Sequence, residues 1–376
     1  MKIILFANTD WYLYNFRLPL GETLRSRGHE VIFLSPPGAH GQRLEAQGFR
    51  WVAFPLSRRG TNPLTELATI WALFRFYKKQ KPDIVHHFTI KCVIYGSLAA
   101  RLAGVKTIVN SITGLGYVFI QNTAQARLLR LAARQLYRLA LRGTHIIFQN
   151  PDDMALFQKY GLVQSSLSTA LIQGSGVDIE RFVPTVEAQG TPLIILPGRM
   201  LYAKGVAEFV EAARILHGEG IKARFALVGN CDLESSPDAV PLQQLQAWQR
   251  EGHVEWLGWQ EDMTSIYASA HVICLPSYRE GLPRALIEAA ACGRAVVASD
   301  VPGCREVVQD GESGLLVPAQ DAQALAGAIR RLLDDTELRL RMGRRGREIA
   351  EQRFSTQQVV SQTISVYNNA VSLRVV

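Results

Sequence analysis

No stretch of this 376-residue sequence is long and apolar enough to cross a membrane. The most apolar helix candidate, residues 67–74, is bounded by Glu66 and Arg75, whereas a transmembrane helix needs about 20 apolar residues. The apolar run over residues 1–7 ends before Asp10 and is too short for a signal peptide. We therefore expect neither a membrane-spanning helix nor a secretory leader.

Cysteine is scarce, and its five positions show no metal-site spacing. Three of the five lie in segments that we expect to be buried, which favours a reducing compartment. The first predicted strand is followed by Asn8-Thr9-Asp10. A dinucleotide-dependent oxidoreductase would have Gly-x-Gly-x-x-Gly there, so this class is disfavoured.

Negative charge is scarce in the first half of the chain. Residues 1–180 contain 21 Lys and Arg against 10 Asp and Glu, and residues 181–376 contain 20 against 23, so the excess positive charge lies in the first half. Such a basic half can bind nucleic acid, a membrane surface or an anionic substrate. A surface for single-stranded nucleic acid would interleave aromatic and basic side chains, a pattern that the basic stripe described below lacks.

Strand-like and helix-like segments alternate in two successive blocks. The strand-like runs are almost continuously apolar, as in parallel sheets covered on both faces. The pattern restarts after residues 185–192, which predicts two Rossmann-like domains, 1–180 and 181–354, followed by a last helix. Ligands of such domains bind at the carboxyl ends of the strands. The expected strands are residues 3–6, 30–34, 84–87, 107–111, 145–149, 193–196, 224–228, 254–257, 272–275, 295–298 and 315–317. The expected helices include residues 16–27, 93–103, 124–141, 206–217, 321–333, 337–352 and 355–372.

One candidate ligand site is the turn before the apolar helix at residues 285–291. Pro283 suits the first position of that helix, whose start offers free N–H groups to an anion. Glu280 lies just before the helix and Glu288 about a turn and a half inside it. Carboxylates beside a phosphate repel it, so this pair suits the hydroxyls of a sugar or a ribose. The alternative is a surface turn with two solvated glutamates.

A second candidate site follows the predicted strand at residues 193–196. Gly198 allows close approach of the backbone. Arg199 has a forked guanidinium suited to phosphate oxygens, and Lys204 adds a point charge. Together with the first site, these residues suit a diphosphate leaving group. The alternative is a strand–loop–helix unit with two exposed basic residues.

With these motifs the chain resembles the retaining glycosyltransferases of family 4, which have the GT-B fold. Their pattern is Gly-Arg, four residues and Lys-Gly, then a glutamate inside Pro-Ser-x-x-Glu-Gly-x-Pro, followed after seven intervening residues by a second glutamate. Here it reads Gly198-Arg199 with Lys204-Gly205, then Glu280 with Glu288. Residues 174–182, 228–229 and 254–258 also look like family segments. The resemblance implies an α/β architecture in which residues 1–180 bind the acceptor, residues 181–354 bind the nucleotide sugar across a central cleft, and residues 355–376 return toward the first domain.

The resemblance implies a UDP-sugar donor and no cofactor. No Asp-x-Asp occurs, so the usual metal ligands are lacking and Arg199 with Lys204 would stabilise the leaving group instead. Glu280 would hold hydroxyls of the donor sugar and Glu288 the ribose. The expected catalytic residues are Arg199, Lys204 and Glu280. The expected donor-binding residues are Gly198, Arg199, Lys204, Gly258, Glu280, Gly281, Leu282, Pro283 and Glu288.

Motifs in the first half are similar to one subgroup of the family, which builds lipid-linked oligosaccharides in bacteria. They are Tyr14–Pro19, Ser57-Arg58 with Asn62-Pro63, and Gly114-Leu-Gly116. The similarity implies transfer of an N-acetylhexosamine to a saccharide on undecaprenyl diphosphate, in glycan, O-antigen or capsule assembly. Many family members have a histidine just before the Gly-Leu-Gly loop, but this chain has Thr113.

Acceptor-side candidates lie where the strands of the first half end. His86 and His87 end one strand, and alternation allows at most one of them to face the ligand. Packing in the core is the alternative for each. Lys91 follows in the same loop and suits a diphosphate, whereas Asp10 is a candidate or only a turn residue. The candidates are Asp10, Arg17, His87, Lys91 and Thr113.

A basic stripe marks the predicted helix over residues 124–142. Its arginines recur at spacings of three and four, which predicts either a face on an anionic membrane or a solvated face. The basic first half and the lipid-linked acceptor favour the membrane, with the protein peripheral on the cytoplasmic side. The stripe is Arg127, Arg130, Arg134, Arg138 and Arg142, and Arg58, Arg59, Lys78, Lys79 and Lys81 can extend it.

A sugar-nucleotide epimerase with the same two-domain shape is the alternative enzyme. It requires acid and base groups beside the sugar, and no convincing set stands out in the sequence. A nucleic-acid binder is disfavoured by the lack of interleaved aromatics.

Overall fold

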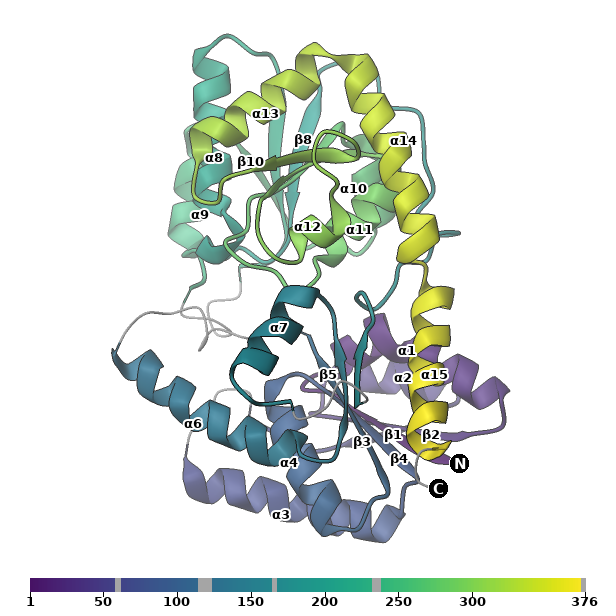
Figure 1. The fold of residues 1–376 in the computed structure, drawn as a ribbon. Coiled ribbons are helices and arrows are strands. Elements are labelled where there is room, and N and C mark those ends of the chain that lie inside the picture. Colours follow the sequence, from purple (N-terminus) through teal and green to yellow (C-terminus); the bar gives the residue numbers. More distant parts are fainter. Residues whose placement is uncertain (58–61, 114–123, 164–167, 232–237, 373–376) are drawn as a thin grey trace. The chain divides into compact units, whose positions relative to one another are not determined.

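Two compact units make up the chain in the computed structural model (Figure 1). Unit 1 comprises residues 1–175 and 357–376, and unit 2 comprises residues 176–356. The structure describes residues 1–57, 62–113, 124–163, 168–231 and 238–372, with the backbone alone at 124–132. The Gly114-Leu-Gly116 motif, Arg58 and Arg59 lie outside the described residues, as do the side chains of Arg127 and Arg130.

A seven-stranded parallel sheet forms the centre of unit 1, in the order β3-β2-β1-β4-β5-β6-β7. Its inner strands are buried on both faces: Ile3 and Leu5 of β1 pack into one cluster, and Ile4 and Phe6 into the opposite one. The strands are β1 (Lys2–Phe6), β2 (Glu30–Ser35), β3 (Arg50–Ala53), β4 (Ile84–Phe88), β5 (Thr107–Ile112), β6 (His145–Phe148) and β7 (Thr169–Leu171).

Helices cover both faces of this sheet. Residues of α1 and α15 join the cluster around Ile3 and Leu5, while residues of α3 and α4 join the cluster around Ile4 and Phe6. The helices of unit 1 are α1 (Asp10–Ser26), α2 (Gly41–Ala46), α3 (Pro63–Gln80), α4 (Ile90–Leu102), α6 (Ala124–Leu141), α7 (Pro151–Lys159) and α15 (Thr356–Ser372).

Unit 2 repeats this plan with a six-stranded parallel sheet, in the order β10-β9-β8-β11-β12-β13. Its strands are β8 (Leu193–Pro197), β9 (Arg224–Val228), β10 (Glu255–Gly258), β11 (Val272–Leu275), β12 (Ala295–Ser299) and β13 (Gly314–Val317). Its helical segments are η2 (Tyr202–Lys204), α8 (Val206–Gly218), α9 (Leu242–Arg250), α10 (Met263–Ser269), α11 (Arg284–Ala291), α12 (Cys304–Val307), α13 (Ala322–Asp334) and α14 (Thr336–Arg353). The prediction of two Rossmann-like units with parallel sheets is confirmed.

The structure differs from the predicted elements at the edges of the unit 1 sheet and at two helix starts. Strands β3 and β7 were not predicted; both are short edge strands, four and three residues long, that are only partly buried. Helix α1 begins at Asp10 instead of residue 16 because the Thr9 side chain accepts a hydrogen bond from Tyr12 N and caps the helix there. Helix α4 begins at Ile90 instead of residue 93.

Candidate active site

The two predicted phosphate motifs meet at one edge of the unit 2 sheet. One follows β8 and the other follows β11, and these strands are parallel neighbours. Their carboxyl ends therefore lie side by side, and the loops that leave them are in contact: Tyr278 N donates a hydrogen bond to Ala203 O at 2.9 Å. Because β8 and β11 are neighbours in the sheet, the parallel topology brings together two segments that are 76 residues apart in sequence.

Two glycines allow this close approach of backbones. Gly205 has φ +72°, and a Cβ at this position would lie 2.1 Å from the carbonyl oxygen of Pro276. Gly229, which follows β9, has φ +145°, and its Cβ would lie 1.8 Å from the carbonyl oxygen of Gly198. Neither contact leaves room for a side chain, so the loops after β8, β9 and β11 pack as a unit at this edge.

The centre of the site is an ion pair between Lys204 and Glu280. Lys204 Nζ contacts Glu280 Oε1, and the hydroxyl of Ser277 donates a hydrogen bond to the same oxygen at 2.7 Å. The side chain of Glu280 is 11% exposed and that of Lys204 is 22% exposed. The Glu280 carboxylate is thus held in place by a cation and a hydroxyl, and both of its oxygens are hydrogen-bond acceptors. It can therefore accept hydrogen bonds from a hydroxyl-bearing ligand.

Arg199 supplies an exposed positive charge next to this pair in the sequence. It directly follows Gly198 at the end of β8 and is exposed. Among the described residues its guanidinium has no hydrogen-bond or ion-pair partner. The five N–H donors of Arg199 are thus available to an anion.

Glu288 forms a second, separate cluster on α11. Arg284 Nε donates a hydrogen bond to Glu288 Oε1 at 2.6 Å, and Tyr267 Oη donates to Oε2 at 3.1 Å. Burial and the neighbouring Glu288 carboxylate raise the pKa of Tyr267 well above its usual value, so its hydroxyl remains a donor. The two glutamates are therefore not solvated surface residues, which had been the alternative interpretation.

Three further donor-side candidates line the turn before α11. Gly281 and Leu282 are partly buried there, while Pro283 is buried and caps the helix. The sequence predicted Pro283 at the first helical position, but its ψ of 108° is extended and the helix begins at Arg284. Gly258 ends β10 with φ +63°, and Gly229 N donates a hydrogen bond to its carbonyl oxygen at 2.8 Å.

Two acceptor-side candidates of unit 1, Asp10 and His87, have structural roles, which the sequence had left open as alternatives to ligand binding. The carboxylate of Asp10 is 5% exposed and accepts hydrogen bonds from His40 N at 2.6 Å and Gly41 N at 2.8 Å, where it caps α2. His87 is fully buried between Asn110 Oδ1 at 2.9 Å and Tyr77 Oη at 3.2 Å. Both ring nitrogens of His87 are thus occupied within the core.

His86 points to the opposite face of the sheet and is equally buried. Its Nδ1 lies 2.6 Å from Tyr367 Oη of α15, and its Nε2 lies 2.7 Å from Ser111 Oγ. Burial lowers the pKa of His86 well below its usual value, and burial lowers the pKa of His87 to about 4. Both rings are therefore neutral at neutral pH, and both histidines adopt the packed alternative.

The other three candidates lie near the carboxyl edge of the unit 1 sheet. Lys91, on α4, pairs with Glu66 at 2.7 Å and donates to Ser57 O at 2.8 Å. Thr113 directly follows β5 and is partly buried. Arg17 is buried on α1 beside the ring of Phe88, the last residue of β4.

Sequence reasoning missed the residues that hold the two glutamates. Ser277 belongs to the Pro-Ser motif, and its spacing of three from Glu280 was a usable signal. Arg284 lies four residues before Glu288 on the same helix, a spacing that also predicts contact. Tyr267 comes from α10, and no local pattern pointed to it.

Comparisons with known proteins agree with this geometry. Residues 178–349 match the family model of glycosyl transferases group 1, and residues 2–150 match the model described as glycosyl transferase 4-like. A Campylobacter jejuni N,N'-diacetylbacillosaminyl-diphospho-undecaprenol alpha-1,3-N-acetylgalactosaminyltransferase is 28% identical over 99% of both chains.

Two further comparisons concern a second enzyme and a solved structure. An Escherichia coli UDP-Gal:alpha-D-GlcNAc-diphosphoundecaprenol alpha-1,3-galactosyltransferase is 25% identical over 76% of this chain and 75% of its own. The structure of Anabaena HepE in complex with UDP and glucose superposes with a TM-score of 0.78, at 20% identity, over 98% of this chain and 99% of that one.

Proposed function

Because the chain belongs to the group 1 glycosyl transferases and has the GT-B fold, we propose that it transfers an N-acetylhexosamine from a UDP-sugar to a saccharide on undecaprenyl diphosphate, with retention of configuration. The observation that carries the proposal is the Lys204–Glu280 pair beside Arg199 at one sheet edge. The names of two relatives support the lipid-linked acceptor, because both specify a diphospho-undecaprenol or diphosphoundecaprenol substrate.

The chemistry follows from where charge develops. As the bond between the anomeric carbon and the β-phosphate oxygen breaks, the electron pair moves onto the phosphate, and Arg199 and Lys204 stabilise it there. Glu280, held in place by Lys204 and Ser277, orients hydroxyls of the donor sugar. The acceptor hydroxyl attacks from the same face and passes its proton to the departing phosphate. Glu288 accepts hydrogen bonds from the ribose.

Release of UDP with and without acceptor tests transfer against the epimerase alternative. A transferase releases UDP in proportion to added lipid-linked saccharide and leaves UDP-N-acetylglucosamine largely intact in its absence. An enzyme that converts or hydrolyses the nucleotide sugar equally fast without acceptor would overturn the proposal.

Replacing each of the two glutamates, Glu280 and Glu288, by glutamine should have a different effect on binding and on turnover. Glu288→Gln should weaken the binding of UDP itself, because the ribose is common to UDP and UDP-sugar. The expected loss of binding free energy is about 1–3 kcal/mol, as for a lost hydrogen bond to a charged group. Glu280→Gln should impair use of the sugar more than binding of UDP. Calorimetry with UDP and with UDP-sugar measures both. Glu255→Gln is the control, because Glu255 pairs with Arg224 at the first residue of β10. Normal UDP binding by Glu288→Gln would contradict the ribose assignment.

Chelation should leave turnover nearly unchanged. Among the described residues no group of three or more His, Cys, Asp and Glu side chains is placed to hold a metal ion, and the charge of the leaving group is assigned to Arg199 and Lys204. Turnover in excess EDTA is the measurement. Loss of activity that Mg²⁺ or Mn²⁺ restores would show that a metal shares this role.

Docking on an anionic membrane is proposed for unit 1. This unit has 22 Lys and Arg against 8 Asp and Glu, whereas unit 2 has 19 against 25. None of the helices in the described part of the chain has the length and apolar character to span a bilayer. Reversible electrostatic docking of the basic unit would place it where a polyprenyl acceptor presents its diphosphate.

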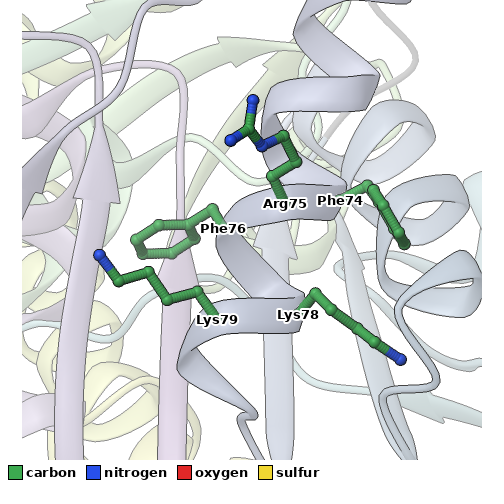
Figure 2. A pocket seen from close by; sticks show the side chains of 5 residues that line it. All are labelled: Phe74, Arg75, Phe76, Lys78 and Lys79. Carbon is green, nitrogen blue, oxygen red and sulfur yellow. The ribbon is translucent and has the colours of Figure 1, made fainter.

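Helix α3 suits this role better than the predicted arginine stripe on α6. Three large apolar side chains of α3 are exposed, Leu64 by 76%, Leu67 by 62% and Trp71 by 60%, and Arg75 and Lys78 continue the same face. Figure 2 shows the basic end of α3, where Phe74 and Phe76 lie on opposite sides of the helix and line a surface pocket together with Arg75, Lys78 and Lys79. Apolar side chains flanked by basic ones are typical of helices that lie in a membrane interface.

Two arginines of the stripe on α6 form contacts within unit 1. Arg134 stacks over the ring of Tyr160 at 4.1 Å, and Arg138 donates to Tyr160 O at 3.3 Å. These contacts tie the described part of the stripe to the segment after α7. We therefore move the proposed membrane face from α6 to α3.

Liposome co-sedimentation tests the α3 face. Wild-type protein should bind anionic vesicles and should not bind neutral ones. Its binding to anionic vesicles should weaken as the salt concentration rises. Replacing Arg75, Lys78 and Lys79 by Glu should weaken binding about 100-fold at low salt, because each basic residue near an anionic surface contributes about 1 kcal/mol. Trp71→Ala should weaken binding at any salt concentration. Leu242→Ala, an exposed apolar residue of unit 2, should bind like wild type. Equal binding to neutral vesicles, or unchanged binding by the triple variant, would contradict the assignment.

A further inference from the structure

Arg17 is a buried cation with no counter-ion among the residues that the structure describes. Its side chain is 4% exposed, and its guanidinium lies 4.3 Å from the ring of Phe88 and 5.3 Å from that of Tyr12. Its described hydrogen bond is from Nη2 to Tyr12 Oη at 2.7 Å, while the buried Nε has no partner among the described residues. Arg17 forms no ion pair with any described carboxylate. The undescribed segments of unit 1 contain no Asp or Glu in their sequence.

The other buried arginines show what a structural role looks like in this chain. Arg339 pairs with Glu187 at 2.8 Å and donates to Leu332 O. Arg294 donates to the carbonyl oxygens of Tyr267 and Ala268 and to the hydroxyl of Thr185. Burying a guanidinium costs several kcal/mol unless its donors are paired. Within the described part of the chain, Arg17 has no carboxylate partner and one hydrogen bond, so packing alone does not account for it.

The place of Arg17 in the fold gives it access to a ligand. Its side chain leans toward the start of α1, as helical side chains do, and there it meets Phe88, the last residue of β4. This is the carboxyl edge of the sheet, where ligands of Rossmann-like units bind. The next residue, Thr89, has φ +72° and ψ 154°, a conformation almost confined to glycine.

Tyr12 extends the site toward solvent. Its ring is only partly buried, and its hydroxyl oxygen accepts the bond from Arg17, so the proton of this hydroxyl is left to donate. No acceptor for it lies among the described residues. Arg17 and Tyr12 thus present a cation and a neutral donor to the same point.

We propose that Arg17 and Tyr12 form an anion-binding site for the diphosphate of the lipid-linked acceptor. This inference rests on the proposed function for the identity of the ligand. Arg17 supplies the counter-charge, and the Tyr12 hydroxyl donates to a phosphate oxygen. The rings of Tyr12 and Phe88 hold the guanidinium in place before the ligand arrives, which lowers the entropy lost on binding.

Calorimetry with farnesyl diphosphate as the probe tests the site without turnover, with farnesol and UDP as further arms. Wild type should bind the diphosphate and not the alcohol. Arg17→Met keeps the length of the side chain and removes its charge. This variant should bind farnesyl diphosphate at least 10-fold more weakly than wild type and should bind UDP unchanged. Tyr12→Phe should weaken the binding of farnesyl diphosphate several-fold. Arg25→Met is the matched control, because Arg25 also lies on α1 and stacks on an aromatic ring, that of Phe49 at 4.0 Å, but is exposed; it should bind like wild type.

Kinetics give a second reading that a purely structural Arg17 would not produce. The KM for the lipid-linked acceptor should rise at least 10-fold in Arg17→Met while the KM for the UDP-sugar stays constant. If Arg17→Met does not fold, Arg17→Lys decides, because it keeps the charge and loses the fork and should weaken diphosphate several-fold. Unchanged diphosphate binding in the folded variant, or equal loss in Arg25→Met, would overturn the inference and leave sugar transfer intact. Absence of transfer by wild type would instead overturn the proposed function.

Discussion

Replacing Arg199 or Lys204 with alanine should lower turnover about 30- to 1,000-fold, the effect of losing about 2–4 kcal/mol of transition-state stabilisation. Both side chains lie at the edge where β8 and β11 end, one exposed and without a described partner and the other paired with Glu280. Their positive charge matters most when the phosphate departs. The loss should therefore fall mainly on kcat, with a smaller effect on binding of UDP.

The control for this pair is Arg224→Ala. Arg224 also lies in unit 2, but at the start of β9, where it pairs with Glu255 near the surface. Its replacement should leave turnover within about twofold, because exposed ion pairs contribute little. Thermal unfolding of each variant checks that the fold is retained. Near-normal turnover of folded Arg199→Ala and Lys204→Ala would remove the leaving-group assignment.

Gly205→Ala should lower both turnover and stability strongly. Its Cβ would lie 2.1 Å from the carbonyl oxygen of Pro276, so the loop of Lys204 and the loop of Glu280 must move apart. We expect turnover to fall about 100-fold, as small displacements of catalytic groups do, and stability to fall by about 2 kcal/mol or more.

Gly220→Ala separates crowding from backbone strain. Gly220 has a similar φ of +83°, but nothing lies within 4 Å of its Cβ position. It should lose about 1 kcal/mol of stability from the left-handed conformation and keep its turnover. Urea unfolding and turnover of both variants make the comparison. Equal turnover losses in the two variants would mean that the packing of the two loops does not position the site.

The parallel sheets were predictable because their inner strands are buried on both faces and read as continuous apolar runs. The edge strands β3 and β7 were not predicted in this way, because they are only four and three residues long and are partly buried. The start of α1 depends on one side-chain cap, from Thr9 to Tyr12 N. A cap of this kind is hard to recognise when aromatic residues follow it.

On the donor side, sequence motifs identified Lys204 and Glu280, but only the neighbouring positions of β8 and β11 bring them into contact. On the acceptor side, local pattern could not distinguish a ligand-facing His87 from a packed one. Its partners Asn110 and Tyr77 come from β5 and α3. The charge of Arg17 was visible in the sequence, whereas its lack of a counter-ion is a tertiary property.

The sequence likewise did not predict which apolar helix face stays exposed after folding. The apolar residues of α3 were interpreted only as too few to span a membrane, yet Leu64, Leu67 and Trp71 remain uncovered after folding. The basic residues of α6 looked like a free stripe, yet Arg134 packs on Tyr160. How much of an amphipathic helix stays exposed is decided by what the rest of unit 1 packs against it.

The mass of the lipid decides whether this chain transfers sugar to a lipid-linked acceptor. Purified protein is incubated with a short-chain polyprenyl-diphosphate saccharide and each of a set of UDP-sugars, and the lipid is analysed by mass spectrometry. We expect the acceptor to gain the mass of one N-acetylhexosamine with one UDP-sugar, and this gain to fall sharply in Lys204→Ala. An unchanged acceptor mass with every UDP-sugar, from protein shown to be folded and to bind UDP, would contradict the proposed function.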